Sequence, residues 1–338
     1  MADDAELAEL VRRTAHATKL SGVVRVDRTG RTIVSEAFGL ADRRHGIRNT
    51  PTTRFGIASG AKGFTALVVM SLVADDVLSL DTTARSLLGD DLPLVDDAVT
   101  VRHLLSHRSG IGDYLDESAD ADINDYPMRV PVHRLADVQS YLRVLDGHPQ
   151  REAPGDTFRY NNGGFVVLSL LAERAAGQPF DGLVDERVSR PAALTATGFD
   201  RSDELPGDVA VGYLHEDGLR SNLLHLPVKG AGDGGIVTTV DDIHRLWPAF
   251  LGDRIVPAHL RASMLEPSSD VLQERMRYGL GFWLHATGTP VMLEGMDAGV
   301  SFRTVHDPDS GTTHTTVANT STGAWQMTKV LDAALDLD

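Results

Sequence analysis

The sequence predicts an α+β fold, in which one antiparallel sheet is flanked by the terminal helices and faces a mostly helical lobe. Segments typical of strands lie near both chain ends, within residues 21–39 and 278–319. Apolar segments of helical length dominate the middle of the chain. We therefore expect a single domain over residues 1–338, with a sheet lobe of about residues 1–60 and 230–338 and a helical lobe of about 61–229. Clefts between lobes are favoured binding sites, so we look for function there.

The composition excludes several classes of protein. The chain has 338 residues, ordinary apolar and charged fractions and a formal net charge of −16, which argues against nucleic acid or an anionic membrane as a partner. It has no cysteine, so disulfides, thiolate metal sites and cysteine nucleophiles are excluded. No spacing of histidine, aspartate and glutamate indicates a metal site, and we expect no metal and no other cofactor.

The first ten residues are acidic and helical in character, without the cationic head and apolar run of a secretory signal. No apolar stretch reaches the roughly 18 residues of a membrane span. We therefore expect a cytoplasmic protein that does not enter a membrane. The oligomeric state is left open.

The N-terminal part begins with an amphipathic helix over residues 5–18. Two strands, 21–27 and 31–39, follow on either side of a hairpin turn. After a polar loop, an extended apolar segment at Phe55 leads into a helix that starts near Ser59 and is apolar on most of its sides.

The middle of the chain is predicted to be helical with long loops. Helix signals cover residues 99–107, 135–145, 165–176 and 180–189, and a connector with Asp81 as a candidate N-cap covers 78–88. The aspartate-rich residues 113–126 are interpreted as a surface excursion.

A glycine-rich loop, residues 230–235, opens the C-terminal part. It does not follow a predicted strand and fits neither phosphate-loop spacing, so nucleotide binding is not favoured. Beyond it we expect a helix that passes through Trp247, then strands and a final helix, at residues 278–285, 291–295, 300–306, 312–319 and 324–335.

Ser59 and Lys62 stand three residues apart at the start of the buried helix, so their side chains share one face. A serine hydroxyl becomes a good nucleophile when a base takes its proton, and a neutral lysine amine can be that base. Free N–H groups at a helix start can also stabilise a negatively charged oxygen. The pair therefore suits nucleophilic catalysis.

The alternative is that Ser59 is an N-cap and Lys62 is a solvated residue of the first turn. Composition weakens this alternative. The chain has four lysines against 28 arginines, so a solvated surface cation in this protein is expected to be an arginine. From these residues alone both interpretations stay open.

Several motifs in order resemble the serine β-lactamase and penicillin-binding protein superfamily. Ser59-Gly-Ala-Lys62 matches its Ser-x-x-Lys, and Tyr160-Asn-Asn162 matches the Tyr-x-Asn of class C β-lactamases, family VIII carboxylesterases and D-aminopeptidases. The segments 104–110, 234–242 and 278–281 are similar to flanking segments of that family. The resemblance covers most of residues 20–335 and implies a β-lactamase/transpeptidase-like fold.

The resemblance also implies roles for single residues. Ser59 would be the nucleophile and Lys62 the base, while Tyr160 would exchange protons with Ser59 and the leaving group. Asn162 would orient Lys62 and bind the amide of the acyl chain, and the backbone N–H groups of Ser59 and Met296 would form the oxyanion hole. Simpler interpretations are a packed loop tyrosine at 160 and a turn asparagine at 162.

Three other residues have side chains that could act as a base or as ligands, but we predict structural roles for them. His107 is expected to support a loop, as the family's histidine does there. Asp233 and Asp297 are interpreted as turn residues rather than ligands.

The third family motif departs from the pattern. Relatives carry Lys-Thr-Gly or His-x-Gly four residues before another glycine, and here Gly295 stands four residues before Gly299. The matching triplet is Leu293-Glu294-Gly295, in which the cation is missing. Because that cation commonly helps to hold a substrate carboxylate in the family, we expect weak or no penicillin hydrolysis.

Glu294 has two open interpretations, because neighbouring strand residues point to opposite faces. It could face away from the site and be solvated or paired with an arginine. Alternatively, a local twist turns it to the rim of the site as a substrate-binding residue, where a carboxylate would favour substrates with an ammonium group.

Together, the residues and the resemblance predict a serine hydrolase that acts on a small-molecule ester or amide through an acyl-enzyme, as an esterase, amidase or D-amino-acid peptidase. One alternative is a transacylase that passes the acyl group to a metabolite. Another is a binding protein that is acylated at Ser59 without turnover.

Overall fold

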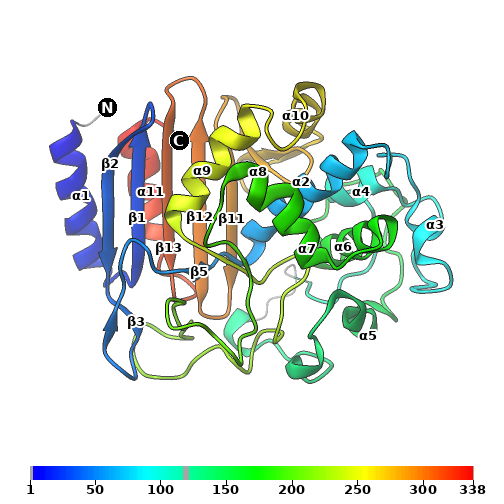
Figure 1. The fold of residues 1–338 in the computed structure, drawn as a ribbon, viewed down its shortest axis with the longest axis horizontal. Coiled ribbons are helices and arrows are strands. Elements are labelled where there is room, and N and C mark those ends of the chain that lie inside the picture. Colours follow the sequence, from blue (N-terminus) through cyan, green and yellow to red (C-terminus); the bar gives the residue numbers. More distant parts are fainter. Residues whose placement is uncertain (1–2, 117–121, 338) are drawn as a thin grey trace.

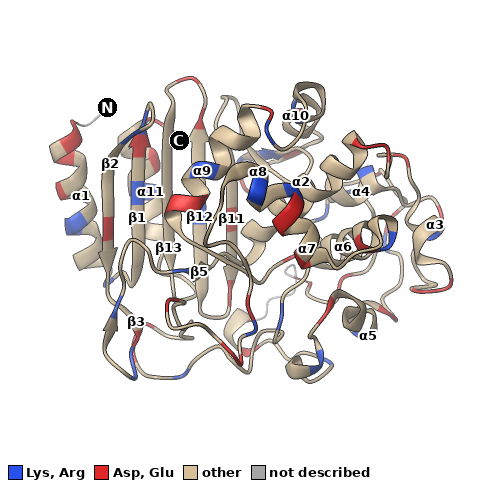
Figure 2. Cartoon of the chain, viewed as in Figure 1, with Lys and Arg blue, Asp and Glu red and all other residues tan. Residues whose placement is uncertain are grey.

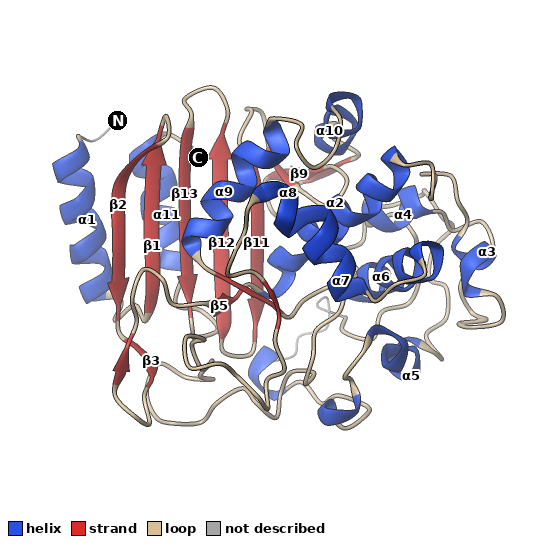
Figure 3. Ribbon diagram, in the orientation of Figure 1, coloured by secondary structure: helices blue, strands red, loops and turns tan. Residues whose placement is uncertain are grey.

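The computed structural model describes residues 3–116 and 122–337. Its largest element is an antiparallel sheet of eight strands in the order β2-β1-β13-β12-β11-β10-β9-β8 (Figures 1 and 3). The strands are β1 (Gly22–Arg28), β2 (Arg31–Phe38), β8 (Ser269–Val271), β9 (Met276–Tyr278), β10 (Trp283–His285), β11 (Val291–Asp297), β12 (Val300–Asp307) and β13 (Thr312–Ala318). The predicted fold class is confirmed.

The two ends of the chain meet in this sheet, where β1 and β13 are the second and third strands from the edge formed by β2. Strand β1 pairs with β13 along its whole length, from Gly22 opposite Ala318 to Arg28 opposite Thr312. Helices α1 (Asp4–Ala17) and α11 (Trp325–Leu335) pack on each other and on one face of the sheet. That face is apolar because valines of the alternating strands meet the apolar stripes of the two helices.

The opposite face of the sheet carries α2 (Ala61–Ala74) and α9 (Val240–Leu251), and α9 lies in front of the strands in Figure 1. Every residue of α2 from Ala61 to Leu72 is buried, as its apolar sequence predicts. A Cβ atom at Gly63 would stand 2.5 Å from a methyl carbon of Leu293 on β11. Glycine at this position therefore lets the helix lie directly on the sheet.

The helical region continues with α6 (Asn162–Ala176), which packs along α2. Around these two helices are shorter ones: α3 (Ala84–Leu88), α4 (Val101–Leu105), α5 (Leu142–Leu145), α7 (Phe180–Val184), α8 (Arg190–Ala192) and α10 (Ala258–Leu265). Two small sheets pair β3 (Leu40–Asp42) with β4 (Ile47–Arg48), and β5 (Phe55–Gly56) with β7 (Ile236–Thr238) and β6 (Gly198–Phe199).

Acidic residues are distributed over the whole molecule. Figure 2 shows them on α1 and α9 as well as in loops at both ends of the view. Within the two described ranges, no helix has both the length and the apolar character of a membrane span.

Several element predictions were wrong in detail. The helix expected at 135–145 is a 3-10 turn (Val138–Tyr141) followed by the short α5, and the strand expected at 278–285 is split between β9 and β10. Asp81 is not the cap of the following helix, because Thr83 occupies the N-cap position of α3. Helix α6 begins at Asn162, three residues before the predicted start.

The aspartate-rich segment predicted as a surface excursion is only partly on the surface. Its residues 117–121 lie outside the described residues. Asp113 and Tyr114 are buried, with exposed fractions of 7% and 8%. The aspartate-rich composition predicted exposure to solvent, but these two side chains are buried and have hydrogen-bond partners near the start of α6 and in the glycine-rich loop.

Candidate active site

Ser59 occupies a 3-10 turn, Ala58–Gly60, between β5 and α2. The N-cap of α2 is Gly60, and no side chain caps that helix end. The interpretation of Ser59 as an N-cap is therefore wrong. Its Oγ instead lies 2.8 Å from Nζ of Lys62, so the expected pairing of the two side chains is present.

Lys62 is only 2% exposed, and three oxygens of the described residues accept hydrogen bonds from its Nζ. Besides Ser59 Oγ, these are Oδ1 of Asn162 at 2.8 Å and the backbone carbonyl of Asp233 at 3.0 Å. The two carbonyl oxygens accept hydrogen bonds but cannot donate them. A neutral amine would give its two N–H groups to them and direct its lone pair at the serine hydroxyl.

Asn162 is fixed by the start of α6. Its backbone N–H donates to Oδ2 of Asp113 at 2.6 Å, the N–H of Gly163 donates to Oδ1 at 2.8 Å, and its side-chain Nδ2 donates to the carbonyl of Leu115 at 3.0 Å. Burial raises the pKa of Asp113 to about 7, against the lowering effect of these backbone N–H groups. Asp113 was not predicted as a site residue, yet it orients the amide that contacts Lys62.

Tyr160 lies beside the lysine, with its ring centroid 4.9 Å from Lys62 Nζ. The ring packs against His107 at 4.4 Å and is stacked with Trp283 at 6.1 Å. The predicted residues Ser59, Lys62, Tyr160 and Asn162 are thus brought together. Proton exchange by Tyr160 stays a prediction.

His107 is buried inside this group, and its Nδ1 accepts a hydrogen bond from the backbone N–H of Asn161 at 3.1 Å. Burial and the neighbouring Lys62 hold its pKa well below the ordinary value. A neutral histidine that binds the loop before α6 fits the structural role predicted for it.

Strand β11 runs directly past the serine turn. A Cβ atom at Gly295 would lie 2.5 Å from the backbone nitrogen of Ser59 and 2.5 Å from the carbonyl oxygen of Ile57. A glycine is therefore required for this approach. Met296, the next residue, lines the pocket in front of Ser59, and its N–H stays a predicted oxyanion donor.

Glu294 does not lie at the rim of the site, which corrects its prediction as a substrate-binding residue. It stands opposite Arg303 in the sheet register, and its Oε2 lies 3.6 Å from that guanidinium. Arg303 in turn contacts Asp332 of α11 at 3.3 Å. The register of β11 with β12 is continuous here, as in the interpretation that pairs Glu294 with an arginine. Strand alternation therefore directs Glu294 to the face that α11 covers, while Leu293 packs on α2.

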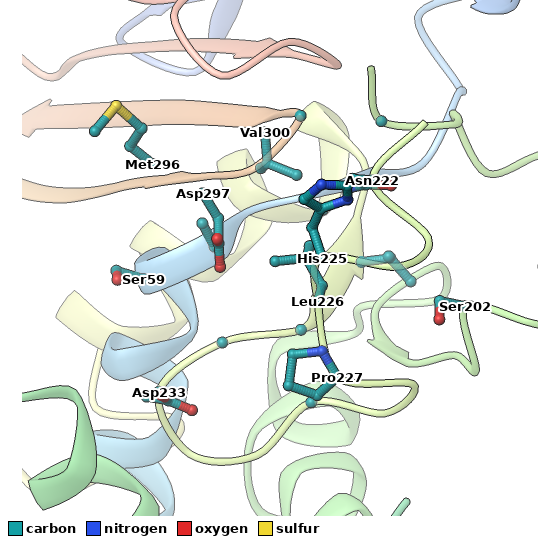
Figure 4. A pocket seen from close by; sticks show the side chains of 18 of the residues that line it. Ser59, Ser202, Asn222, His225, Leu226, Pro227, Asp233, Met296, Asp297 and Val300 are labelled. Carbon is teal, nitrogen blue, oxygen red and sulfur yellow. The ribbon is translucent and has the colours of Figure 1, made fainter. Parts of the chain in front are cut away.

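A pocket opens in front of Ser59, and we call it the Ser59 pocket (Figure 4). Its wall combines β11, the glycine-rich loop and residues 200–228. The lining includes Ser59, Tyr114, Tyr126, Tyr141, Asn162, Asp200, Ser202, Asn222, His225, Asp233, Met296 and Asp297.

Two aspartates of this pocket were predicted to be only turn residues. Asp233 accepts a hydrogen bond from the hydroxyl of Tyr114 at 2.5 Å, and Asp297 projects from the end of β11. The alternation of Leu293, Gly295 and Asp297 on one face was a signal that could have identified Asp297. No sequence pattern indicated Asn222 or His225, which come from an irregular segment. Among the described residues, no group of three histidine, aspartate or glutamate side chains could hold a metal ion.

A serine and a buried lysine one turn apart, at a helix start that lies against an antiparallel sheet, are typical of serine enzymes that form an acyl-enzyme. The model of the Beta-lactamase family matches residues 7–337. The protein belongs to this family, and the resemblance inferred from the motifs is confirmed.

Known proteins of several activities are similar to this chain. Esterase EstB of Burkholderia gladioli is 35% identical over 185 residues, which cover 53% of this chain and 47% of the esterase. A D-aminopeptidase of Brucella anthropi is 28% identical over 275 residues, or 79% of this chain and 49% of the aminopeptidase. The chain thus spans about half the length of these two relatives.

A solved structure is similar over its whole length. The crystal structure of a penicillin binding protein from Bacillus halodurans has a TM-score of 0.88 and 32% sequence identity to this chain. The alignment covers 96% of this chain and 99% of that one.

Proposed function

We propose that the protein is a serine hydrolase that cleaves a small ester or amide through an acyl-enzyme at Ser59. The observation that carries this proposal is the contact set of Lys62. Its Nζ is 2.8 Å from the serine hydroxyl, and two carbonyl oxygens hold it in place. The esterase and the D-aminopeptidase among its relatives support an ester or amide as the substrate.

The first half of the reaction forms the acyl-enzyme. Ser59 Oγ attacks the carbonyl carbon while its proton passes to Lys62 Nζ. The carbonyl oxygen becomes negatively charged between the N–H groups of Ser59 and Met296. When the tetrahedral intermediate collapses, the bond to the leaving group breaks, and the leaving alcohol or amine takes up the proton by way of Tyr160.

The second half reverses these roles. A water molecule attacks the ester carbon of the acyl-enzyme and gives a proton to the same basic group. The bond between the acyl carbon and Ser59 Oγ then breaks, and the serine recovers its hydrogen. The products are a carboxylic acid and the alcohol or amine released earlier.

A labelling experiment tests the nucleophile. A fluorophosphonate probe should modify the wild-type protein and Ser202→Ala, but not Ser59→Ala. Ser202 is the matched control, because it lines the same pocket. Labelling that persists in Ser59→Ala would place the nucleophile elsewhere.

Intact mass with an activated ester then separates hydrolysis from the alternatives. A burst followed by steady release of acid is expected from a hydrolase. A stoichiometric adduct that lasts would contradict turnover, and transfer to an added alcohol in preference to water would indicate a transacylase.

Benzylpenicillin should be hydrolysed poorly or not at all. Leu293 stands where relatives carry a cation, and its side chain is buried against Gly63. The substrate carboxylate would therefore meet no positive charge at this position. The measurement is the loss of β-lactam absorbance, and rapid hydrolysis by the wild-type protein would contradict the prediction.

A further inference from the structure

The Ser59 pocket lies on the acyl side of the proposed reaction. Ser59, Asn162 and Met296 are among the described residues that line it, whereas Tyr160 is not. In the proposed reaction the leaving group takes up its proton by way of Tyr160, so it departs on the side of that ring. The acyl group is therefore the part of the substrate that extends into the pocket.

Residues 122–128 form one wall of this pocket, and we call them the lid segment. The segment contains a 3-10 turn, Ile123–Asp125. Its side chains that line the pocket are those of Ile123, Tyr126 and Met128. The lid segment thus presents mainly apolar surface to the group that lies in the pocket.

The lid segment is tied to the sheet by one of its polar side chains. Oδ1 of Asn124 accepts a hydrogen bond from Oγ of Ser321 at 2.6 Å, and that Oγ accepts one from the backbone N–H of Gly299 at 2.8 Å. Ser321 is only 3% exposed and lies just beyond the end of β13. Gly299 lies in the turn between β11 and β12, whose residues Asp297 and Val300 also line the pocket (Figure 4). The contact between Asn124 and Ser321, which we call the clasp, therefore joins two walls of the pocket.

The clasp is a hydrogen bond between two neutral side chains, and such a bond changes an equilibrium by roughly two- to ten-fold. Breaking it therefore costs little. The hydroxyl of Tyr126 donates to the backbone carbonyl of Tyr114, and Met128 packs against the apolar core, so these contacts hold the lid segment to the helical region. Opening of the clasp thus separates the two walls without detaching the lid segment.

We propose that the clasp makes the enzyme selective for small acyl groups. The inference rests on the proposed function. With the clasp formed, the acyl group lies between the serine turn and the side chains of the lid segment, so it must fit that space. A larger acyl group enters when Asn124 and Ser321 separate, and its reaction then loses the contribution of their bond. These two residues determine specificity without touching the reacting atoms.

The test compares three esters of one chromogenic alcohol, with propanoyl, cyclohexylpropanoyl and adamantylpropanoyl acyl groups, each ring standing on the terminal carbon. The chain next to the carbonyl is the same in all three, so they differ mainly in bulk. In Asn124→Ala, kcat/KM of the adamantyl ester should rise by roughly two- to ten-fold over wild type, the contribution of one hydrogen bond. The propanoyl ester fits beneath the closed lid segment, so its kcat/KM should change by less than about two-fold.

Three further variants separate the clasp from other effects. Asn124→Asp keeps a side-chain oxygen that accepts the bond from Ser321, so it should retain the wild-type selectivity. Asp125→Ala changes the exposed residue next to the clasp and should retain it as well. Ser321→Ala removes the clasp from its other side and should act like Asn124→Ala. The double variant should gain nothing further, because both changes remove the same bond.

Hydrogen exchange gives a readout that does not depend on catalysis. A peptide that covers residues 122–128 should exchange faster in Asn124→Ala and Ser321→Ala than in the wild type and Asn124→Asp, because its backbone groups exchange when the lid segment opens. Faster exchange throughout the chain would show a general loss of stability and would contradict the clasp. The rate of fluorophosphonate labelling at Ser59 reports whether each variant retains a folded site.

The outcomes distinguish this inference from the proposed function. Equal gains for all three esters, no gain for the adamantyl ester in Asn124→Ala, or unchanged exchange of residues 122–128 would overturn the role of the clasp and leave the hydrolase intact. Failure of the wild-type protein to turn over any of the esters or to be labelled at Ser59 would overturn both.

Discussion

Charged groups are buried in two different ways on the two faces of the sheet. Behind the sheet, Asp332 of α11 lies between His314, at 2.8 Å, and Arg303, at 3.3 Å, and Arg303 also reaches Glu294. In front of it, Lys62 is held by oxygens that carry no formal charge, and Asp113 accepts hydrogen bonds from backbone N–H groups.

Ion pairs behind the sheet and neutral hydrogen-bond partners in front of it suit different tasks. Charged side chains that hold each other neutralise their fields locally and tie elements together. Backbone groups, hydroxyls and side-chain amides fix the position of a charged or basic group without supplying an opposite full charge. The first arrangement suits the junction between α11 and the sheet, and the second suits a site that exchanges protons.

The largest expected effect concerns Lys62. Lys62→Arg should be nearly as inactive as Lys62→Ala, because arginine keeps its charge but cannot give up its proton. The loss of kcat should be about 10²-fold or more, the usual scale for a general base. The same change at the exposed Lys329 should have no effect, and activity of Lys62→Arg within a few-fold of wild type would show that Lys62 supplies only charge.

Behind the sheet, the effect should be on stability and not on chemistry. Asp332→Asn leaves Arg303 and His314 without their shared carboxylate, and the free energy of unfolding should fall by about 3 kcal/mol. Urea denaturation measures this value. The kcat of the folded fraction should stay within about two-fold of wild type, because substitutions at distant sites without shared partners usually act independently. A large drop in kcat would show that the two faces are coupled.

Asp113 provides a pH-dependent test of the front face. Its pKa of about 7 lies above the ordinary value of 3.8, so between these pH values the folded protein holds a proton that the unfolded chain has lost. Stability from this group is therefore lost as pH rises from about 4 to about 7, with a slope of at most about 1.4 kcal/mol per pH unit. Unfolding curves of Asp113→Asn should lack this contribution, and equal pH slopes in the two proteins would contradict it.

The smallest effect is expected for Glu294→Gln. Arg303 keeps its contact with Asp332 in this variant, so the free energy of unfolding should change by about 1 kcal/mol or less. Ester selectivity should be unchanged. A shift in selectivity would show that Glu294 acts in the site, although its side chain points away from it.

Short-range patterns predicted the centre of the site, and long-range contacts decided the rest. The three-residue spacing of Ser59 and Lys62 is enough to predict their contact, because both lie in one helical turn. Glu294 and Asp297 could not be separated in this way, since the face of each depends on whether β11 twists locally. Asp113 was misinterpreted because its partners are backbone N–H groups of a helix 49 residues further along the chain.

The sheet was predicted from the strand segments at the two chain ends, but their register was not. Pairing of β1 with β13 follows from contacts across almost the entire sequence. Strand β7 has only three residues, too few for a periodic pattern, and its place between β5 and β6 depends on tertiary contacts.

The meeting of the two chain ends in one sheet also fixes when the protein can act during its synthesis. A growing chain that stops before Val291 already contains Ser59, Lys62, Tyr160 and Asn162, but it lacks the strand that lies against the serine turn. Domains fold as their last elements emerge from the ribosome. The proposed nucleophile therefore gains its predicted oxyanion donor, the N–H of Met296, only after residues 291–297 have been added to the growing chain.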